Sequence, residues 1–276
     1  MRSNAGWAWR EGRRLVGERT GEIHPTAVVH PSACLGPGVR IGPFAVIGEG
    51  VCLGEDVEVG PHVVLEGPLE VGPRCQIHVG AVIGLPPQDL KWKPDTPSGV
   101  RIGEGTVIRE YATIHRASTP DGFTVLGKEC YLMAQGHIAH DCQIGDNVIM
   151  TGYTALTGFV QVGDRAVISG LTGIHQFVRI GTLAMVSGCS RIGQDVPPYF
   201  IVEGNPAEVR GVNIVGLRRA GVPADVRLNI QRAYKILYRS GRAPGPALEQ
   251  IRSEIEPSPE IERLCEFIAS SKRGIC

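Results

Sequence analysis

An aliphatic residue recurs at every sixth position over most of this chain, and this period limits the fold more than any other feature. Glycine follows many of these anchor positions, and a small residue tends to stand four places after each. Such a unit describes a short strand followed by a corner. The anchors are Ile23, Val29, Leu35, Ile41, Ile47, Leu53, Val59, Leu65, Val71, Ile77 and Ile83, then Ile102, Ile108 and Ile114, then Leu126, Leu132, Ile138, Ile144, Met150, Leu156, Val162, Ile168, Ile174, Ile180, Val186 and Ile192.

Three such units would close one triangular coil of about 18 residues, and successive coils would stack at the inter-strand spacing of roughly 4.8 Å. Residues 18 positions apart would then lie one above another. The composition agrees, because 37 glycines, 20 prolines and only 5% aromatic residues suit short strands joined by tight turns. The predicted fold class is mainly β, a parallel β-helix of hexapeptide repeats.

Two segments break the repeat and must loop out of the stack: an insertion at about residues 85–99 and a shorter one at 118–123. Loops that project from a rigid scaffold are where binding groups tend to lie. Three domains are predicted: an N-terminal extension (1–22), either disordered or a start-site artefact, the β-helix (23–205), and a C-terminal α-helical domain (206–276). In the last, residues 223–239, 246–256 and 259–271 are predicted helices that cap the open end of the β-helix.

Charge and cysteine content exclude several classes of protein. The 28 basic and 28 acidic residues balance, which gives no global attraction to nucleic acid. No apolar run is long enough for a membrane span and no secretory signal is visible, so a cytoplasmic location is predicted. Eight cysteines occur without a CxxC pair, and Cys75, Cys130 and Cys142 share a column of small residues. They are predicted to be buried small hydrophobes, with a disulfide or metal site as the less favoured alternative.

The 18-residue stacking predicts which polar residues lie close together. His140, Gly158 and Gln176 are successively 18 residues apart and should form one column, with His137 and His175 close by. An imidazole can take the proton of an attacking hydroxyl, as acyl transfer to an alcohol requires. Asp141 could orient His140 only if the pair sits at a corner. A carbonyl oxygen could approach the backbone N–H of Gly158.

The residues alone favour a surface histidine at a corner over a catalytic one. A metal ligand ranks third, and the spacing disfavours it further, because neither His137 nor His140 is a whole number of coils from His175.

A set of long motifs then narrows the reading: QDLKW (88–92), TIHR (113–116), HIAHDC (137–142), IHQF (174–177), QDVPPY (194–199), GVNIVGLRR (211–219) and AYKILYRSG (233–241). With these motifs, residues 23–275 closely resemble the bacterial UDP-N-acetylglucosamine O-acyltransferases, the first enzymes of lipid A biosynthesis. The resemblance implies a left-handed coil and a homotrimer with active sites between subunits. It also implies transfer of an (R)-3-hydroxyacyl chain from acyl carrier protein to the 3-hydroxyl of UDP-N-acetylglucosamine.

The resemblance implies no metal and no dissociable cofactor, since the acyl donor is the phosphopantetheine thioester of acyl carrier protein. Carried over by position, His140 is the expected general base, Asp141 its orienting partner and Gly158 the oxyanion donor. Gly188 occupies the position that governs acyl-chain length. The expected contacts to the sugar nucleotide or the acyl-carrier arm are Asp89, Lys91, His137, His175, Gln176, Asn213 and Arg219.

Three residues depart from the family pattern. Phe159 stands where a histidine commonly follows the oxyanion glycine, Val215 replaces an acidic residue, and Ala220 replaces a second arginine. These departures alter the expected substrate pocket and leave the expected base and its surroundings in place, so acylation of a related acceptor such as a 3-amino UDP sugar is an alternative. A non-catalytic β-helix with a binding or structural role is another. The later N-acyltransferase of the same pathway is a weaker match, because its additional N-terminal domain is not found in this sequence.

Overall fold

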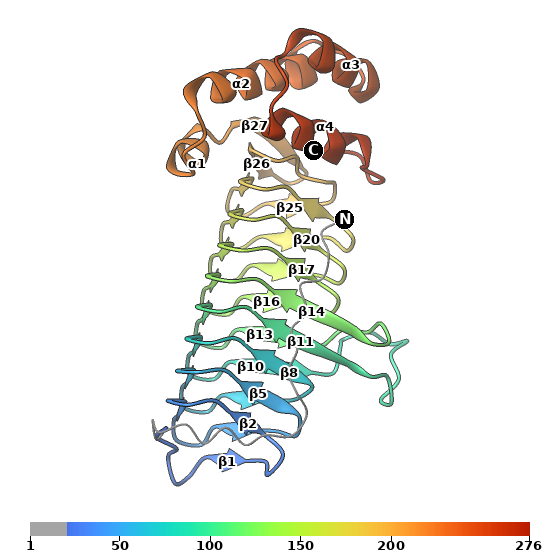
Figure 1. The fold of residues 1–276 in the computed structure, drawn as a ribbon. Helices are drawn as coiled ribbons and strands as arrows, with labels where there is room; N and C mark the ends of the chain where they lie inside the picture. Colours follow the sequence, from blue (N-terminus) through green and yellow to red (C-terminus); the bar gives the residue numbers. More distant parts are fainter. Residues whose placement is uncertain (1–20) are drawn as a thin grey trace.

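The structure of the protein is a computed structural model that describes residues 21–276. Nearly all of the predicted extension, residues 1–20, lies outside the described residues. From Ile23 onward the chain winds into a three-sided prism, with helices stacked on the end that is reached last (Figure 1). Strands one coil apart pair in parallel at the predicted 18-residue offset, for example Val28 with Val46 and His137 with Ala155.

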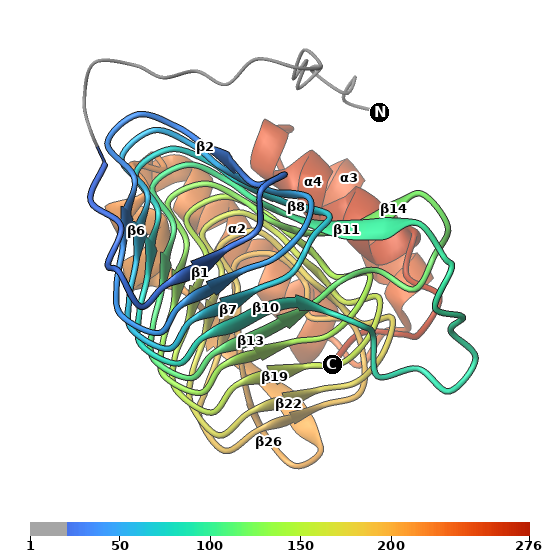
Figure 2. The same ribbon diagram turned by 90° about the horizontal axis from the view of Figure 1, so that it is seen from below.

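The described part of the chain forms three sheets, one on each side of the prism (Figure 2). Sheet B contains β1 (Val28–Val29), β4 (Val46–Ile47), β7 (Val64–Leu65), β10 (Val82–Leu85), β13 (Thr113–His115), β16 (His137–Ile138), β19 (Ala155–Leu156), β22 (Gly173–Ile174) and β25 (Arg191–Ile192). Sheet C contains β2 (Cys34–Leu35), β5 (Val51–Leu53), β8 (Leu69–Val71), β11 (Ser98–Ile102), β14 (Gly122–Leu126), β17 (Gln143–Ile144), β20 (Gln161–Val162) and β23 (Arg179–Ile180).

Sheet A extends furthest toward the helical end. It contains β3 (Arg40–Ile41), β6 (Glu58–Val59), β9 (Gln76–Ile77), β12 (Val107–Ile108), β15 (Tyr131–Leu132), β18 (Ile149–Met150), β21 (Val167–Ile168), β24 (Met185–Val186), β26 (Phe200–Gly204) and β27 (Ala207–Val212). The last pair breaks the pattern, since β27 returns antiparallel to β26. That hairpin was not predicted.

The anchor residues fill the interior as the period predicts. Ile41 is 2% exposed and Ile114 is fully buried, whereas Ile23 is 46% exposed because it belongs to the first coil that residues 21–276 form. Cys75, Cys130 and Cys142 are buried free thiols in the same core, which confirms their predicted role as small hydrophobes. Each repeat therefore contributes one aliphatic side chain to a continuous apolar column.

Both insertions leave the prism at the same corner. We call the turns that lead from a sheet B strand to the next sheet C strand the B–C corner. Residues 86–97 project there between β10 and β11, and residues 116–121 project there between β13 and β14 (Figures 1 and 2). The two longest irregular segments of the β-helix are thus placed beside each other along one edge.

Four helices complete the described chain: α1 (Ile214–Arg219), α2 (Ala224–Arg239), α3 (Pro244–Glu254) and α4 (Pro259–Ala269). The last three agree with the predicted helices, and α1 is additional. Buried Tyr199 and Phe200 pack into the helical core against residues such as Leu264. Asp195, 1% exposed, pairs with Arg179, whose guanidinium also lies 4.4 Å from the centroid of the Phe267 ring on α4. No helix within residues 21–276 is long and apolar enough to cross a membrane.

Candidate active site

The predicted column of polar residues exists and lies on the B–C corner. His140, Gly158 and Gln176 occupy equivalent places in three successive turns. The backbone N–H of Phe159 donates to the carbonyl of His140 at 3.1 Å, and that of Phe177 donates to the carbonyl of Gly158 at 3.2 Å. These bonds tie each turn to the next, so the backbone fixes the relative placement of the three residues.

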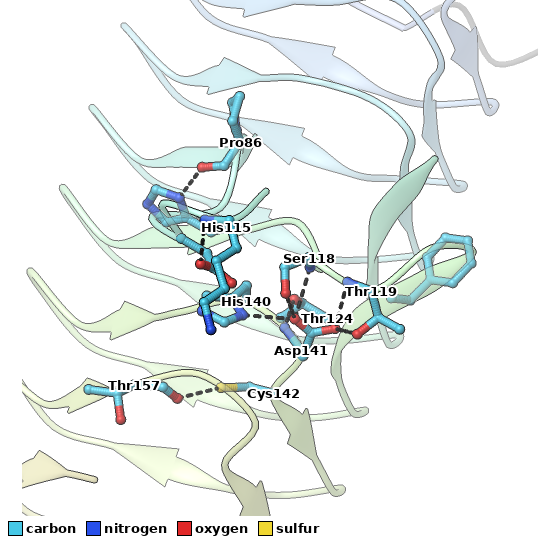
Figure 3. Close-up of polar contacts among 12 residues, drawn as sticks. Pro86, His115, Ser118, Thr119, Thr124, His140, Asp141, Cys142 and Thr157 are labelled. Atoms are coloured by element: carbon cyan, nitrogen blue, oxygen red, sulfur yellow. Dashed lines mark hydrogen bonds and ion pairs between the residues drawn. The ribbon is translucent and has the colours of Figure 1, made fainter. Parts of the chain in front are cut away.

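His140 and Asp141 form the closest polar pair of this column. Asp141 has a φ of 60°, in the left-handed region, and this corner geometry turns its side chain toward its neighbour. The His140 Nδ1 atom lies 2.8 Å from Oδ2 of Asp141, and His140 is only 4% exposed (Figure 3). If Nδ1 donates to the carboxylate, Nε2 keeps its lone pair and can accept a proton.

The second insertion holds the carboxylate of Asp141 in place. Oδ2 accepts hydrogen bonds from the Ser118 backbone N–H at 2.8 Å and hydroxyl at 2.7 Å, and Oδ1 accepts from the Thr119 N–H at 3.2 Å and hydroxyl at 2.6 Å (Figure 3). Burial opposes ionisation of Asp141, but the bonds from His140, Thr119 and Ser118 outweigh it and hold the pKa of this carboxyl well below its usual range. Ser118 and Thr119 were not singled out from the sequence, which showed only that their segment loops out.

Gly158 lies directly against the imidazole of His140. A Cβ atom added at Gly158 would lie 2.4 Å from Cε1 and 2.6 Å from Nε2 of that ring, so no larger residue fits without displacing it. Within residues 21–276 the backbone N–H of Gly158 has no hydrogen-bond acceptor. The ring that can accept a proton and a backbone N–H without an acceptor in residues 21–276 therefore belong to neighbouring residues.

Phe159 brings an apolar ring to the base. Its ring meets the His140 imidazole edge-on, with centroids 5.3 Å apart and planes at 90°. On the other side it stacks on Phe177 at 4.9 Å and 14°. The residue that departs from the family pattern is therefore in direct contact with the candidate base.

A second pair of histidines lies N-terminal to His140. Nδ1 of His137 is 2.7 Å from the hydroxyl of Thr113, and the rings of His137 and His115 meet edge to face at 5.4 Å. Burial, followed by the charges of His115 and His140, lowers the pKa of His137 to about 4. His137 is therefore neutral near pH 7 and available as a hydrogen-bonding group.

His115 is a site residue that the sequence reasoning missed, although it lies in the quoted TIHR motif. It is 9% exposed, and its Nδ1 is 2.6 Å from the carbonyl of Pro86, the first residue of the longer insertion (Figure 3). In that insertion Asp89 accepts from the backbone N–H of Lys91 at 2.9 Å, and the Lys91 side chain is exposed. Asp89 thus shapes the turn that presents Lys91 to solvent.

Of the remaining residues predicted to bind substrate, some lie on the B–C corner and others lie elsewhere in the chain. His175 and Gln176 are exposed on the B–C corner. Gly188 lies on a different corner, in the turn from β24 of sheet A to β25 of sheet B. Asn213 caps α1: its side chain accepts from Gly216 N and donates to the carbonyl of Leu183, each at 2.9 Å.

Arg219 is in the last turn of α1, and this helix lies on the side of the molecule away from the projecting loops (Figure 1). One chain therefore does not bring Gly188, Asn213 and Arg219 to His140. Within the described chain, no group of three or more His, Cys, Asp or Glu side chains is arranged to hold a metal ion.

Comparisons with known proteins agree with the geometry. A family model described as "Udp N-acetylglucosamine O-acyltransferase; Domain 2" matches residues 195–276. An acyl-[acyl-carrier-protein]–UDP-N-acetylglucosamine O-acyltransferase of Thermodesulfovibrio yellowstonii is 48% identical over 92% of this chain and 99% of its own length. One of Rippkaea orientalis is 51% identical over 91% of each chain.

Among solved structures, a UDP-N-acetylglucosamine acyltransferase from Bacteroides fragilis superposes with a TM-score of 0.90 at 38% identity, covering 92% of this chain and 99% of the other. The predicted fold class, a left-handed parallel β-helix with C-terminal helices, is confirmed by these neighbours and by the parallel sheets. By sequence and by structure, this chain belongs to the acyl-[acyl-carrier-protein]–UDP-N-acetylglucosamine O-acyltransferase family.

Proposed function

We propose that this protein transfers an (R)-3-hydroxyacyl chain from acyl carrier protein to the 3-hydroxyl of UDP-N-acetylglucosamine, as the first step of lipid A biosynthesis in the cytoplasm. The observation that carries the proposal is the arrangement around His140. Its Nδ1 is engaged by Asp141, while its Nε2 faces the surface of Gly158. Family membership supplies the substrate class, and this arrangement supplies the chemistry.

In the proposed reaction Nε2 of His140 takes the proton of the sugar 3-hydroxyl as that oxygen attacks the thioester carbonyl. The C–O bond forms, and the carbonyl oxygen becomes an oxyanion that accepts a hydrogen bond from the N–H of Gly158. Collapse of this intermediate breaks the C–S bond, and His140 returns the proton to the phosphopantetheine sulfur. Asp141 stays ionised and stabilises the imidazolium formed between the two proton transfers.

The proposal includes no metal and no dissociable cofactor, because an imidazole base and a backbone donor suffice for acyl transfer to an alcohol. The phosphopantetheine arm belongs to the acyl donor. Lys91 on the projecting loop supports the proposed substrates, because both carry phosphate groups. Its exposed ammonium group lies beside the corner and could bind a phosphate of either one.

We further propose that the working enzyme is a homotrimer. The residues expected to contact substrate are split between the B–C corner, with His140 and His175, and distant positions, with Gly188 and Arg219. A neighbouring copy that presents its sheet A–sheet B corner to this B–C corner would complete the site. Light scattering should give a mass of three chains. Coexpression of a His140→Ala chain with an Arg219→Ala chain should restore activity that neither variant has alone.

The central test is product analysis by mass spectrometry with UDP-N-acetylglucosamine and a mixture of acyl carrier protein thioesters of different chain length. His140→Ala should lower turnover roughly a thousandfold, within the range known for general bases, while circular dichroism stays unchanged. His30→Ala is the matched control, because His30 is exposed on the first coil. Unchanged turnover in the His140→Ala enzyme would remove the mechanism.

A 3-amino UDP sugar is the second candidate acceptor, and Phe159 is the observation that favours it. A ring 5.3 Å from His140 replaces the polar group of relatives with an apolar wall. A neutral amine is a better nucleophile than a hydroxyl and depends less on a base. Competition between the two acceptors, read as O-acylated against N-acylated product, separates the candidates.

A further inference from the structure

The last residues of the chain are anchored over the B–C corner. The backbone N–H of Asp195 donates to the carbonyl of Gly274 at 3.0 Å, and the N–H of Cys276 donates to the carbonyl of Asp195 at 2.9 Å. The Tyr238 hydroxyl donates to the carbonyl of Cys276 at 2.7 Å. We call residues 271–276 the C-terminal tail. It lies one turn beyond the coil of His175, and these bonds fix its position.

Arg273 reaches from this tail to the predicted substrate-binding histidine. Its Nε and Nη2 donate to the carbonyl of Gly193 at 3.3 and 3.2 Å, and the same Nη2 lies 3.1 Å from Nδ1 of His175. Arg273 and His175 are 98 positions apart in the sequence. The carbonyl of Gly193 therefore holds the guanidinium in the place where it meets His175.

This contact decides which nitrogen of His175 carries the proton. A guanidinium can only donate, so Nδ1 must accept and the proton must reside on Nε2. The competing partner of Nδ1 is the carbonyl of Gln176 at 3.2 Å, which would require a protonated Nδ1. A hydrogen bond from a charged donor is roughly twice as strong as a neutral one. Gln176 is an exposed residue, so its carbonyl can bind water instead.

We propose that Arg273 is a positioning residue that holds His175 in the tautomer protonated on Nε2 and so presents an N–H donor to the sugar nucleotide. The inference rests on the proposed function for the identity of the ligand. The oxygens of a nucleotide diphosphate, a hydroxyl or an acetamido carbonyl accept hydrogen bonds. The other tautomer would turn a nitrogen lone pair toward them and repel them.

The direct test is spectroscopic. Solid-state NMR of sedimented protein labelled with 15N-histidine distinguishes protonated from unprotonated ring nitrogens, and His175→Asn identifies the signals of this residue. Wild-type protein should show unprotonated Nδ1 and protonated Nε2. Arg273→Met should reverse this, with Nδ1 donating to the carbonyl of Gln176. The matched control is Lys272→Met, which removes the neighbouring exposed cation and should leave the wild-type pattern.

Kinetics supply the functional readout. Arg273→Met should raise KM for UDP-N-acetylglucosamine about tenfold, as expected for one hydrogen bond to substrate weakened indirectly. It should leave kcat and the KM for acyl carrier protein nearly unchanged. Arg273→Lys keeps a charged donor and should recover part of the loss, while Lys272→Met should match wild type.

Protonated Nδ1 in the wild-type protein, or the same tautomer in Arg273→Met and wild type, would overturn the inference. So would an unchanged KM for the sugar nucleotide in a folded Arg273→Met enzyme. The tautomer is read without turnover. A wild-type protein that has the expected tautomer but does not acylate UDP-N-acetylglucosamine would therefore refute the proposed function and leave the contact established.

Discussion

Oδ2 of Asp141 lies 2.8 Å from Nδ1 of His140, and the same carboxylate accepts four hydrogen bonds from Ser118 and Thr119. The orientation of the candidate base therefore depends on an insertion that interrupts the repeat one coil earlier. The segment that interrupts the six-residue period therefore holds the carboxylate that orients His140.

Asp141→Asn should reduce kcat by roughly 10²–10⁴-fold, because an amide can turn its NH2 group toward Nδ1 and stabilise the wrong tautomer of His140. The Ser118 and Thr119 donors also lose their ionised acceptor, so we expect a stability loss of about 1–3 kcal/mol. Steady-state kinetics and urea unfolding measure the two effects. Asp121→Asn is the control, since Asp121 is exposed on the same insertion. Equal activity of the two variants would contradict the orienting role.

Gly158→Ala should inactivate the enzyme by about 100-fold or more, because its Cβ would lie 2.6 Å from Nε2 of His140 and displace the ring. Gly173→Ala is the matched control one coil later, where an added Cβ meets nothing within 4 Å. Turnover and thermal unfolding of both variants should separate loss of geometry from loss of fold. Full activity in the Gly158→Ala enzyme would show that this glycine does not face the reacting atoms.

His137 should make stability depend on pH. Its pKa is about 4 in the folded protein against an ordinary value near 6.5, so the unfolded chain binds a proton first as the pH falls. The free energy of unfolding should therefore decrease between pH 6.5 and 4, by at most about 1.4 kcal/mol per pH unit for this group. Urea unfolding of His137→Gln should show a flatter dependence than wild type. His30→Gln should not, and identical slopes for all three proteins would refute the assignment.

Asp195→Ala should destabilise the protein by about 1–3 kcal/mol, because it removes the buried carboxylate that accepts hydrogen bonds from Arg179 and Ser271 at the junction of β-helix and helices. Cleavage near α4 in limited proteolysis should accelerate as the helices detach. For comparison, Arg40→Ala breaks an exposed pair with Glu58 and should cost no more than about 1 kcal/mol. Similar losses in both variants would mean that the buried pair adds no special stability.

Phe159→His should shift acceptor preference toward UDP-N-acetylglucosamine by about 10-fold or less, because it restores a polar side chain beside His140 at the expense of the stack on Phe177. The ratio of O-acylated to N-acylated product under competition measures the shift. Phe177→Leu, which removes the stack without adding polarity, is the control. If the ratio of O-acylated to N-acylated product is unchanged in Phe159→His, residue 159 does not determine the choice of acceptor.

The sequence predicted the β-helix well because each repeat carries its own signal. An aliphatic anchor every sixth residue specified the pairing of residues 18 apart, and the column of His140, Gly158 and Gln176 followed from it. The hairpin of β26 and β27 gave no such signal, since it occurs once. Helix α1 is only six residues long, too short for an apolar period.

The contacts that the sequence did not reveal join segments distant along the chain. Ser118 meets Asp141 and Pro86 meets His115 because two irregular loops fold back on one corner. Arg273 meets His175 because the helices return the chain to that corner. No period relates these positions, so only the folded arrangement reveals them.

Both insertions project from the B–C corner, and the C-terminal tail contacts the same corner. The distance between the loops and the tail is therefore set by the number of coils that separate them. Each coil adds about 4.8 Å of rise, so the number of coils between residue 86 and Arg273 fixes the span between the loop and the tail. Adding a whole coil between them would lengthen that span by one step and keep every side chain on its own edge. Extra residues that do not complete a coil loop out at a corner instead, as the segment before β11 does, and leave the later positions on their own edges. The span between the loop and the tail should therefore change in steps of one coil, and not gradually with loop length.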